Sequence, residues 1–278
     1  ELKRALAAGV PASRIVFSGV GKTKEEMAAA LEAGILQFNV ESEPELEALS
    51  EVATGRAQTA AIALRMNPGV DAQTHAKITT GMAHNKFGIA AARIPEVYAR
   101  AARLPGIAPV GIAVHIGSQL TELAPFRLAF RRAAEMTRAL RQAGQAVRRL
   151  DLGGGLGISY RGETPPRPAD YAAVLREETK GLDCEFIIEP GRSLVAEAGV
   201  LLTRVIYVKD GEKKSPTENG RRFVIIDAAM NDLIRPMLYD AWHTIRTVRE
   251  PPTGTPNAVV DLVGPICETG DTFALDRD

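Results

Sequence analysis

The sequence predicts an α/β protein: a (β/α)8 barrel that lacks its first units in this chain, followed by a second, mostly β domain. Six apolar strand-like runs alternate with helix-like stretches over residues 1–197, which is typical of a parallel sheet covered by helices. Over residues 198–278 strand-like runs follow one another almost without helices. A parallel barrel requires eight units. Because the chain begins inside a helix-like stretch, we expect the missing units to precede Glu1, and the second domain to be truncated.

The elements of the first domain follow from apolar periodicity and capping residues. Thr23 with Glu26, and Ser42 with Glu45, each match a capping box that begins a helix. From residue 125 to 143 apolar residues recur at helical spacing and predict one buried stripe; they are Phe126, Ala129, Phe130, Ala133, Thr137 and Leu140. Predicted strands cover residues 14–17, 36–40, 60–66, 110–116, 149–152 and 185–188, and further helices cover 2–9, 95–104 and 168–180.

The second domain is predicted from three β-rich runs, at 200–208, 221–226 and 258–263, with one helix-like stretch at 233–243. A polar, hairpin-like segment, 209–220, joins the first two runs. In the first domain, residues 67–88 are polar and contain several glycines, and irregular segments of that length are usually functional. An open, doubly wound sheet is the alternative fold, but no G-x-G-x-x-G follows the first strand to support it.

Composition excludes several classes of function. The 278 residues are 45% hydrophobic and 24% charged, with a formal net charge of zero, so we expect no nucleic-acid partner and no anionic membrane partner. No run approaches the ~20 apolar residues that span a bilayer. The two cysteines, Cys184 and Cys267, are far apart and have no metal-binding spacing, which favours a reducing, cytoplasmic compartment and no metal site.

Polar or glycine-rich residues follow three predicted strands. Glu189-Pro190-Gly191-Arg192 follows one, His115-Ile116-Gly117-Ser118 ends another, and Gly153-Gly154-Gly155 ends the strand between them. Ligands bind at the carboxyl ends of parallel strands, so we expect a site there. Each motif alone also has a structural interpretation: a solvated strand exit, a histidine satisfied in the core, and a tight strand-to-helix turn.

Two later motifs sharpen the interpretation: Arg235-Pro236-Met237-Leu238-Tyr239 and Cys267-Glu268-Thr269-Gly270-Asp271. In this combination and order the chain resembles the fold-type III pyridoxal-phosphate enzymes, the group of alanine racemase and ornithine decarboxylase. Within that group it is similar to the diaminopimelate decarboxylases. The resemblance extends over the whole chain and implies pyridoxal 5'-phosphate as cofactor, an amino-acid substrate, and decarboxylation of meso-2,6-diaminopimelate to L-lysine, the last step of lysine biosynthesis.

The resemblance assigns a role to each motif. His115 stacks on the cofactor ring, Glu189 faces the pyridine nitrogen, and Cys267 is the proton donor. The cofactor phosphate is assigned to the glycine run and to the segments around Ser118 and Gly191. The resemblance assigns the substrate's distal end to Arg192, Arg235 and Tyr239, since a guanidinium matches a carboxylate. It assigns the substrate's amine to Glu268. Arg235 and Tyr239 are spaced i, i+4, so one helical turn places them on the same face.

The resemblance also implies a homodimer with shared active sites, in which Lys86 of one subunit pairs with Asp271 of the other. The family's lysine that bonds covalently to the cofactor lies on the first barrel strand, and Lys22, Lys77 and Lys86 do not match its motif. We therefore expect this chain to be inactive alone. Two alternatives remain open: a decarboxylase of the same fold that acts on ornithine, arginine or carboxynorspermidine, and a non-catalytic regulatory homologue.

Overall fold

The protein has two compact units. The structure, a computed structural model, describes residues 1–71, 86–211, 220–250, 252–255 and 258–277. The first unit comprises Glu1–Ile158 and Pro165–Leu194, and the second comprises Ser159–Thr164 and Val195–Asp278. The sequence placed one boundary after residue 197 and did not anticipate that residues 159–164 belong with the second unit. Of the residues that the sequence singled out, Lys77 lies outside the described ranges, as do most of the irregular segment 67–88 and of the hairpin-like segment 209–220.

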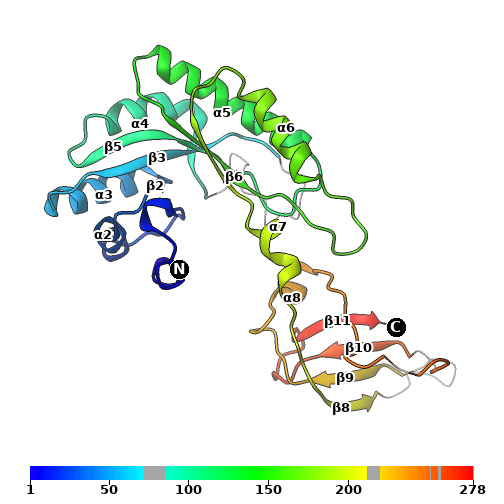
Figure 1. Ribbon diagram of the computed structural model, residues 1–278. Coiled ribbons are helices and arrows are strands. Elements are labelled where there is room, and N and C mark those ends of the chain that lie inside the picture. The colour runs from blue at the N-terminus through cyan, green and yellow to red at the C-terminus, as the bar shows by residue number, and fades with distance from the viewer. Residues whose placement is uncertain (72–85, 212–219, 251, 256–257, 278) are drawn as a thin grey trace. The chain divides into compact units, whose positions relative to one another are not determined.

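A curved parallel sheet forms the first unit (Figure 1). Its described strands are β1 (Val16–Phe17), β2 (Gln37–Val40), β3 (Ala60–Asn67), β4 (Ile89–Ala90), β5 (Ile107–Ala113), β6 (Arg149–Gly154) and β7 (Glu185–Glu189). They lie in the order β1-β2-β3-β5-β6-β7, with β4 beside β3. Each strand is added on the same side of the previous one, as in a barrel, whereas a doubly wound sheet reverses its order. The predicted barrel class is confirmed, in the form of a partial barrel.

The helices of the first unit lie close to their predicted ranges, and two of them begin directly after the predicted capping residues Thr23 and Ser42. They are α1 (Leu2–Ala7), α2 (Lys24–Ala33), α3 (Glu43–Gly55), α4 (Ile94–Ala101), α5 (Ala124–Gln142) and α6 (Pro168–Glu178), with short 3-10 turns at Ala12–Arg14 and Ala91–Arg93. Thr23 and Glu26 form the predicted capping box of α2. At α3 the prediction is half right: Ser42 accepts the Glu45 N–H, but the Glu45 side chain accepts the Glu41 N–H.

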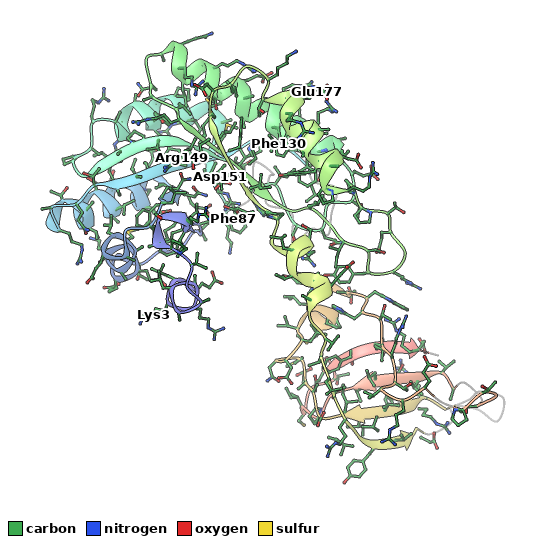
Figure 2. All side chains as sticks on the ribbon, in the orientation of Figure 1. Lys3, Phe87, Phe130, Arg149, Asp151 and Glu177 are labelled. Carbon is green, nitrogen blue, oxygen red and sulfur yellow. The ribbon has the colours of Figure 1, made fainter. Side chains whose placement is uncertain are left out.

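The core of this unit lies between the sheet and its outer helices. All six apolar and small residues of the predicted α5 stripe are buried. On α5, Phe126 and Phe130 pack edge-on against the ring of Tyr171 from α6, with centroids 5.1 and 5.5 Å away. Residues alternate between the two faces of a strand: Leu150 and Leu152 of β6 belong to this core. In Figure 2, Asp151 and Phe87 are labelled on the side of the sheet away from Phe130.

Two strand boundaries at the site differ from the prediction, and one short strand was not predicted. β5 begins and ends three residues before the predicted strand 110–116, so that His115 lies two residues beyond it. β6 continues into Gly153 and Gly154, which the sequence analysis placed after the strand. The two-residue strand β4 was not predicted, because its pairing with Met66 and Asn67 of β3 is a tertiary contact. The first two differences matter for the site.

The second unit is a mixed sheet in the order β11-β10-β9-β8. Its strands are β8 (Val205–Asp210), β9 (Arg222–Ile226), β10 (Val260–Val263) and β11 (Thr272–Arg277), and its helix is α8 (Arg235–Tyr239). The predicted helix 233–243 is thus shortened to five residues, and β11 was missed. A short helix, α7 (Gly191–Val195), and a 3-10 turn at Ala196–Ala198 precede this sheet. No helix in the described residues has the length and apolarity to cross a membrane.

Candidate functional site

A cavity of about 310 Å³ lies at the carboxyl ends of the parallel strands. Residues at the ends of five strands line it, together with the segment before β4; they are Ser18, Gly19, Asn39, Arg65, Phe87, Ala113, Val114, His115 and Glu189. His115 and Glu189 come from separate motifs of the sequence, and the fold brings both into one cavity wall. The volume is within the range of small-ligand pockets.

His115 is held in a fixed orientation. Its Nδ1 accepts a hydrogen bond of 3.1 Å from the Gly154 N–H, so the neutral ring carries its proton on Nε2. Burial and the positive charge of Arg65 lower the pKa of His115 to about 4. The imidazole is therefore neutral at physiological pH and presents an uncharged aromatic face to the cavity.

Two carboxyl groups lie side by side, Asp151 within β6 and Glu189 at the end of β7. Asp151 is buried and accepts hydrogen bonds from Asn39 Nδ2 at 2.8 Å and from the Gly153 N–H at 3.0 Å. Burial and the charge of Asp151 raise the pKa of Glu189 to about 8, and burial raises that of Asp151. Glu189 is the last residue of β7 and lines the cavity. Such a pair suits a cationic ligand group.

The glycine run allows three backbone segments to approach closely. A Cβ on Gly154 would lie 1.9 Å from Glu189 O, and one on Gly155 would lie 2.4 Å from Gly117 O. A Cβ on Gly153 would lie 2.3 Å from Val114 O. The N–H groups of Gly153 and Gly154 already donate to Asp151 and His115. Glycine is therefore required here by packing, and Gly155 is the member of the run whose N–H best suits an anion.

Ser118 and Arg192 meet in the first unit. Arg192, the second residue of α7, donates to Ser118 Oγ from Nη2 at 3.0 Å and from Nε at 3.3 Å. Gly191 begins this short helix directly after Glu189 and Pro190. The structure therefore brings together two residues that the sequence assigned to the same anionic group from motifs 74 positions apart.

A network of buried charges that was not predicted from the sequence lies at the cavity wall. Arg65 Nη1 lies 2.6 Å from Glu41 Oε1, and Lys22 Nζ lies 2.7 Å from Glu45 Oε1, with all four side chains at most 9% exposed. One signal was available: Arg65 is a charged residue inside the apolar run 60–66, where an arginine needs a buried partner. Glu45 was interpreted only as a helix-capping residue, and Glu41 was not singled out.

Of the predicted substrate residues, Arg192 lies in the first unit, and Arg235, Tyr239 and Glu268 lie in the second. Arg235 and Tyr239 are the first and last residues of α8. Arg235 Nη1 lies 2.9 Å from His243 Nε2, and its guanidinium stacks over the Tyr160 ring at 4.5 Å. Tyr160 belongs to the inserted segment 159–164 of this unit. Neither Tyr160 nor His243 was singled out from the sequence, because their contact with Arg235 is tertiary.

Cys267 and Glu268 are exposed in the loop between β10 and β11. Asp271, four residues after the cysteine, is buried instead: its carboxylate accepts the N–H groups of Met230 at 2.6 Å and of Ile266 at 2.8 Å. Asp271 thus shapes this loop within the chain. Lys86 is exposed, with its Nζ 5.3 Å from the Phe87 ring centroid. The intersubunit Lys86–Asp271 pair stays a prediction.

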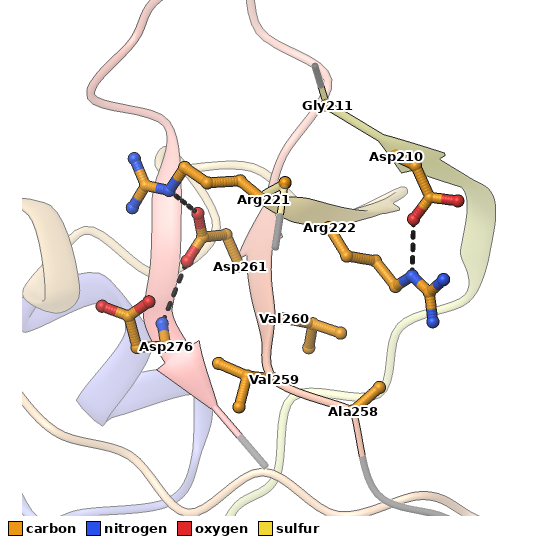
Figure 3. A pocket seen from close by; sticks show the side chains of 10 residues that line it. Asp210, Gly211, Arg221, Arg222, Ala258, Val259, Val260, Asp261 and Asp276 are labelled. Carbon is orange, nitrogen blue, oxygen red and sulfur yellow. Dashed lines mark hydrogen bonds and ion pairs between the residues drawn. The ribbon is translucent and has the colours of Figure 1, made fainter. Parts of the chain in front are cut away.

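A larger hollow, of about 690 Å³, lies at one end of the second sheet (Figure 3). Four of its charged side chains form two ion pairs: Arg221 Nε lies 2.7 Å from Asp261 Oδ2, and Arg222 Nε lies 2.6 Å from Asp210 Oδ1. It contains none of the residues that the sequence singled out. The cavity at the strand ends of the first unit is therefore the better candidate site.

Comparison with known proteins supports the resemblance drawn from the motifs. Residues 1–196 match the model of the pyridoxal-binding domain of pyridoxal-dependent decarboxylases. The chain is 53% identical to the diaminopimelate decarboxylase of Zymomonas mobilis and 53% identical to that of Pseudomonas aeruginosa, over all of this chain and 64% and 65% of theirs. It is similar to the crystal structure of the Helicobacter pylori diaminopimelate decarboxylase complexed with L-lysine, with a TM-score of 0.90 and 42% identity over 99% of this chain and 67% of that one. The chain thus spans just under two thirds of the curated relatives named here.

Proposed function

Because the chain belongs to the family of pyridoxal-dependent decarboxylases, we propose that the protein converts meso-2,6-diaminopimelate to L-lysine and carbon dioxide, as the last step of lysine biosynthesis. The observation that carries this proposal is the cavity in which His115 and Glu189 meet, together with the names of the relatives that match the whole chain. We further propose a cytoplasmic location, supported by two widely separated cysteines that are both unpaired.

The residues of the cavity fit pyridoxal 5'-phosphate. The neutral imidazole of His115 offers an aromatic face for stacking, and Glu189 beside Asp151 offers a carboxyl group that would lose its proton next to a cationic ring nitrogen. An anion at that position keeps a ring nitrogen protonated. When bound, the protonated cofactor withdraws electrons from the bond that breaks. Gly155, Ser118 and the backbone at Gly191 and Arg192 are assigned to the phosphate.

We assign the substrate's distal carboxylate to the guanidinium groups. Arg235, held by His243 and Tyr160, has the planar fork that matches a carboxylate. Arg192 and Tyr239 are assigned to the same end of the substrate, and Glu268 to its amine. Cys267 would deliver a proton to the carbon that has lost carbon dioxide. Its exposed thiol is consistent with this role, whereas burial of the half-buried Cys184 raises its thiol pKa.

The test is carbon dioxide release by the complete protein from meso-2,6-diaminopimelate, ornithine, arginine and carboxynorspermidine. We expect release from diaminopimelate only. Cys267→Ala should lower kcat by roughly 10²-fold or more, the contribution of a positioned proton donor, while Cys184→Ala leaves kcat unchanged and serves as the matched control. Release from another substrate would move the assignment to that enzyme of the same fold, and no release from any would favour a regulatory homologue.

We also propose a homodimer with shared active sites, which the candidate Lys86–Asp271 pair would stabilise. The test mixes two inactive variants, Cys267→Ala and Arg192→Ala, under conditions in which subunits exchange. If the two residues serve a site from different subunits, some mixed dimers regain one intact site and part of the activity returns. Demonstrated exchange without any return of activity would assign the site to a single chain.

A further inference from the structure

Glu41 organises the wall of the cavity from behind. It directly follows β2, its side chain is 2% exposed, and it accepts three hydrogen bonds. Oε1 accepts from Arg65 Nη1 at 2.6 Å and from the Gly19 N–H at 3.2 Å, and Oε2 accepts from the Gly88 N–H at 3.0 Å. One carboxylate thus connects the end of β1, strand β3 and the segment before β4.

The backbone is shaped to allow these contacts. Gly88 has a φ of +73°, and a Cβ there would lie 2.9 Å from Arg65 O, so only glycine brings its N–H to Glu41 without strain. Glu41 is itself held, because its N–H donates to Glu45 Oε2 at 2.9 Å while Glu45 Oε1 pairs with Lys22. Lys22 donates further to Gly19 O and Asn39 O, each at 2.7 Å. Glu41 therefore has little freedom to move.

Arg65 is the positively charged side chain in the described cavity wall. Beyond its pair with Glu41, its guanidinium stacks over the Phe87 ring at 5.0 Å and donates from Nη2 to His115 O at 3.5 Å. Its charge is close enough to oppose the upward pKa shifts of Asp151 and Glu189, which burial causes. Within the described residues, however, no ion pair joins Arg65 to either acid.

Arg65 pairs with Glu41 although two other carboxyl groups lie near it. A buried guanidinium and two neighbouring carboxyl groups would be expected to pair, since buried charges without partners are unfavourable. Arg65 pairs with Glu41 instead. Glu189 lines the cavity and accepts from Ser18 at 3.5 Å, whereas Asp151 is buried beside it, where it interacts with Glu189 and accepts a hydrogen bond from the uncharged Asn39.

We propose that Glu41 is a positioning residue: it holds the Arg65 guanidinium on the wall formed by β2 and β3, and so keeps Glu189, with Asp151 buried beside it, available for a cationic ring nitrogen. The cationic ligand rests on the proposed function, whereas the control of Arg65 by Glu41 does not. Without the negative charge of Glu41, Arg65 turns toward the two acids and occupies the position that the ring nitrogen needs.

The experiment compares Glu41→Gln, the double variant Glu41→Gln/Arg65→Gln, and the control Glu45→Gln. Glutamine keeps an oxygen that can accept a backbone N–H, and Glu45→Gln disturbs the adjacent buried pair without releasing Arg65. The first readout is the titration of the Asp151 and Glu189 carboxyl groups by carbon-13 NMR of the protein without cofactor. Glu41→Gln should lower both pKa values by about one unit, the scale of a nearby opposite charge. The double variant should restore high values, and Glu45→Gln should leave them unchanged.

The second readout is binding of pyridoxal 5'-phosphate, with inorganic phosphate as the probe that lacks the ring. Glu41→Gln should weaken the binding of pyridoxal 5'-phosphate by about tenfold, which is equivalent to that pKa shift, and should leave the binding of inorganic phosphate unchanged. The double variant should recover most of the lost affinity for pyridoxal 5'-phosphate. If the titrations do not change in Glu41→Gln, or if the double variant binds no better than Glu41→Gln, Glu41 is only structural. If the titrations behave as expected but the unmodified protein does not bind pyridoxal 5'-phosphate, the positioning role stands and the proposed function fails.

Discussion

Substitution of Gly154 by alanine tests whether close packing of β6 against β7 builds the site. The new Cβ would lie 1.9 Å from Glu189 O and 2.8 Å from Glu189 C, whereas carbon and oxygen atoms in contact are normally more than ~3.3 Å apart. Both neighbours are backbone atoms in paired strands, so β7 must move by more than an ångström. We expect a loss of about 3 kcal/mol in the free energy of unfolding, at the upper end for overpacking. Because Glu189 moves with β7, binding of pyridoxal 5'-phosphate should weaken as well.

The matched control is Gly55→Ala. Gly55 is the last residue of α3 and has no left-handed φ, and a Cβ on it would meet no neighbouring atom within 4 Å, so alanine there should stabilise by up to about 1 kcal/mol. Urea unfolding is followed by circular dichroism, because the single tryptophan, Trp242, lies in the second unit and would report on that part. If Gly154→Ala unfolds at the same urea concentration as Gly55→Ala, the argument from packing is refuted.

Three further predictions concern titrating groups, each measured by urea unfolding across pH. His115 has a pKa of about 4 when folded and about 6.5 when unfolded, so its contribution to stability is lost as pH falls from 6.5 toward 4. His115→Gln should remove about 3 kcal/mol of that dependence, and an unchanged profile would contradict a neutral His115. The pKa of Glu189 is raised to about 8, so its contribution to stability is present below about pH 4.5 and lost as pH rises through 8. Glu189→Gln should therefore be more stable relative to the unmodified protein at pH 9 than at pH 5. The opposite trend would show a charged Glu189. Lys22→Met leaves Glu45 buried without its cation and should lose about 3 kcal/mol at pH 8 but less at pH 5, where Glu45 can take up a proton. Lys24→Met, which breaks an exposed pair with Glu51, should lose less than about 1 kcal/mol, and equal losses for the two lysines would rule out a special role for burial.

Local rules in the sequence determined the order and type of most elements. The α5 stripe from Phe126 to Leu140 and the capping box of Thr23 with Glu26 depend on neighbours three or four residues away, and such interactions are visible without a fold. The positions of His115 and Glu189 near strand ends were also readable, because parallel strands direct the residues after them to one edge of the sheet. The identity of the family followed from these motifs taken together.

Only the tertiary structure decided which residues of the site contact one another. The pairing of Glu41 with Arg65 spans 24 positions, that of Asp151 with Asn39 spans 112, and that of Arg192 with Ser118 spans 74. Sequence spacing carries no signal for such contacts, because they depend on how far each strand continues and on which face its side chains lie. Because β5 ends three residues earlier than predicted, His115 lies outside the strand, where its Nδ1 accepts the Gly154 N–H. The sequence by itself thus determined which residues could form a cofactor site, and long-range packing determined which charged groups line the cavity and with which partners they pair.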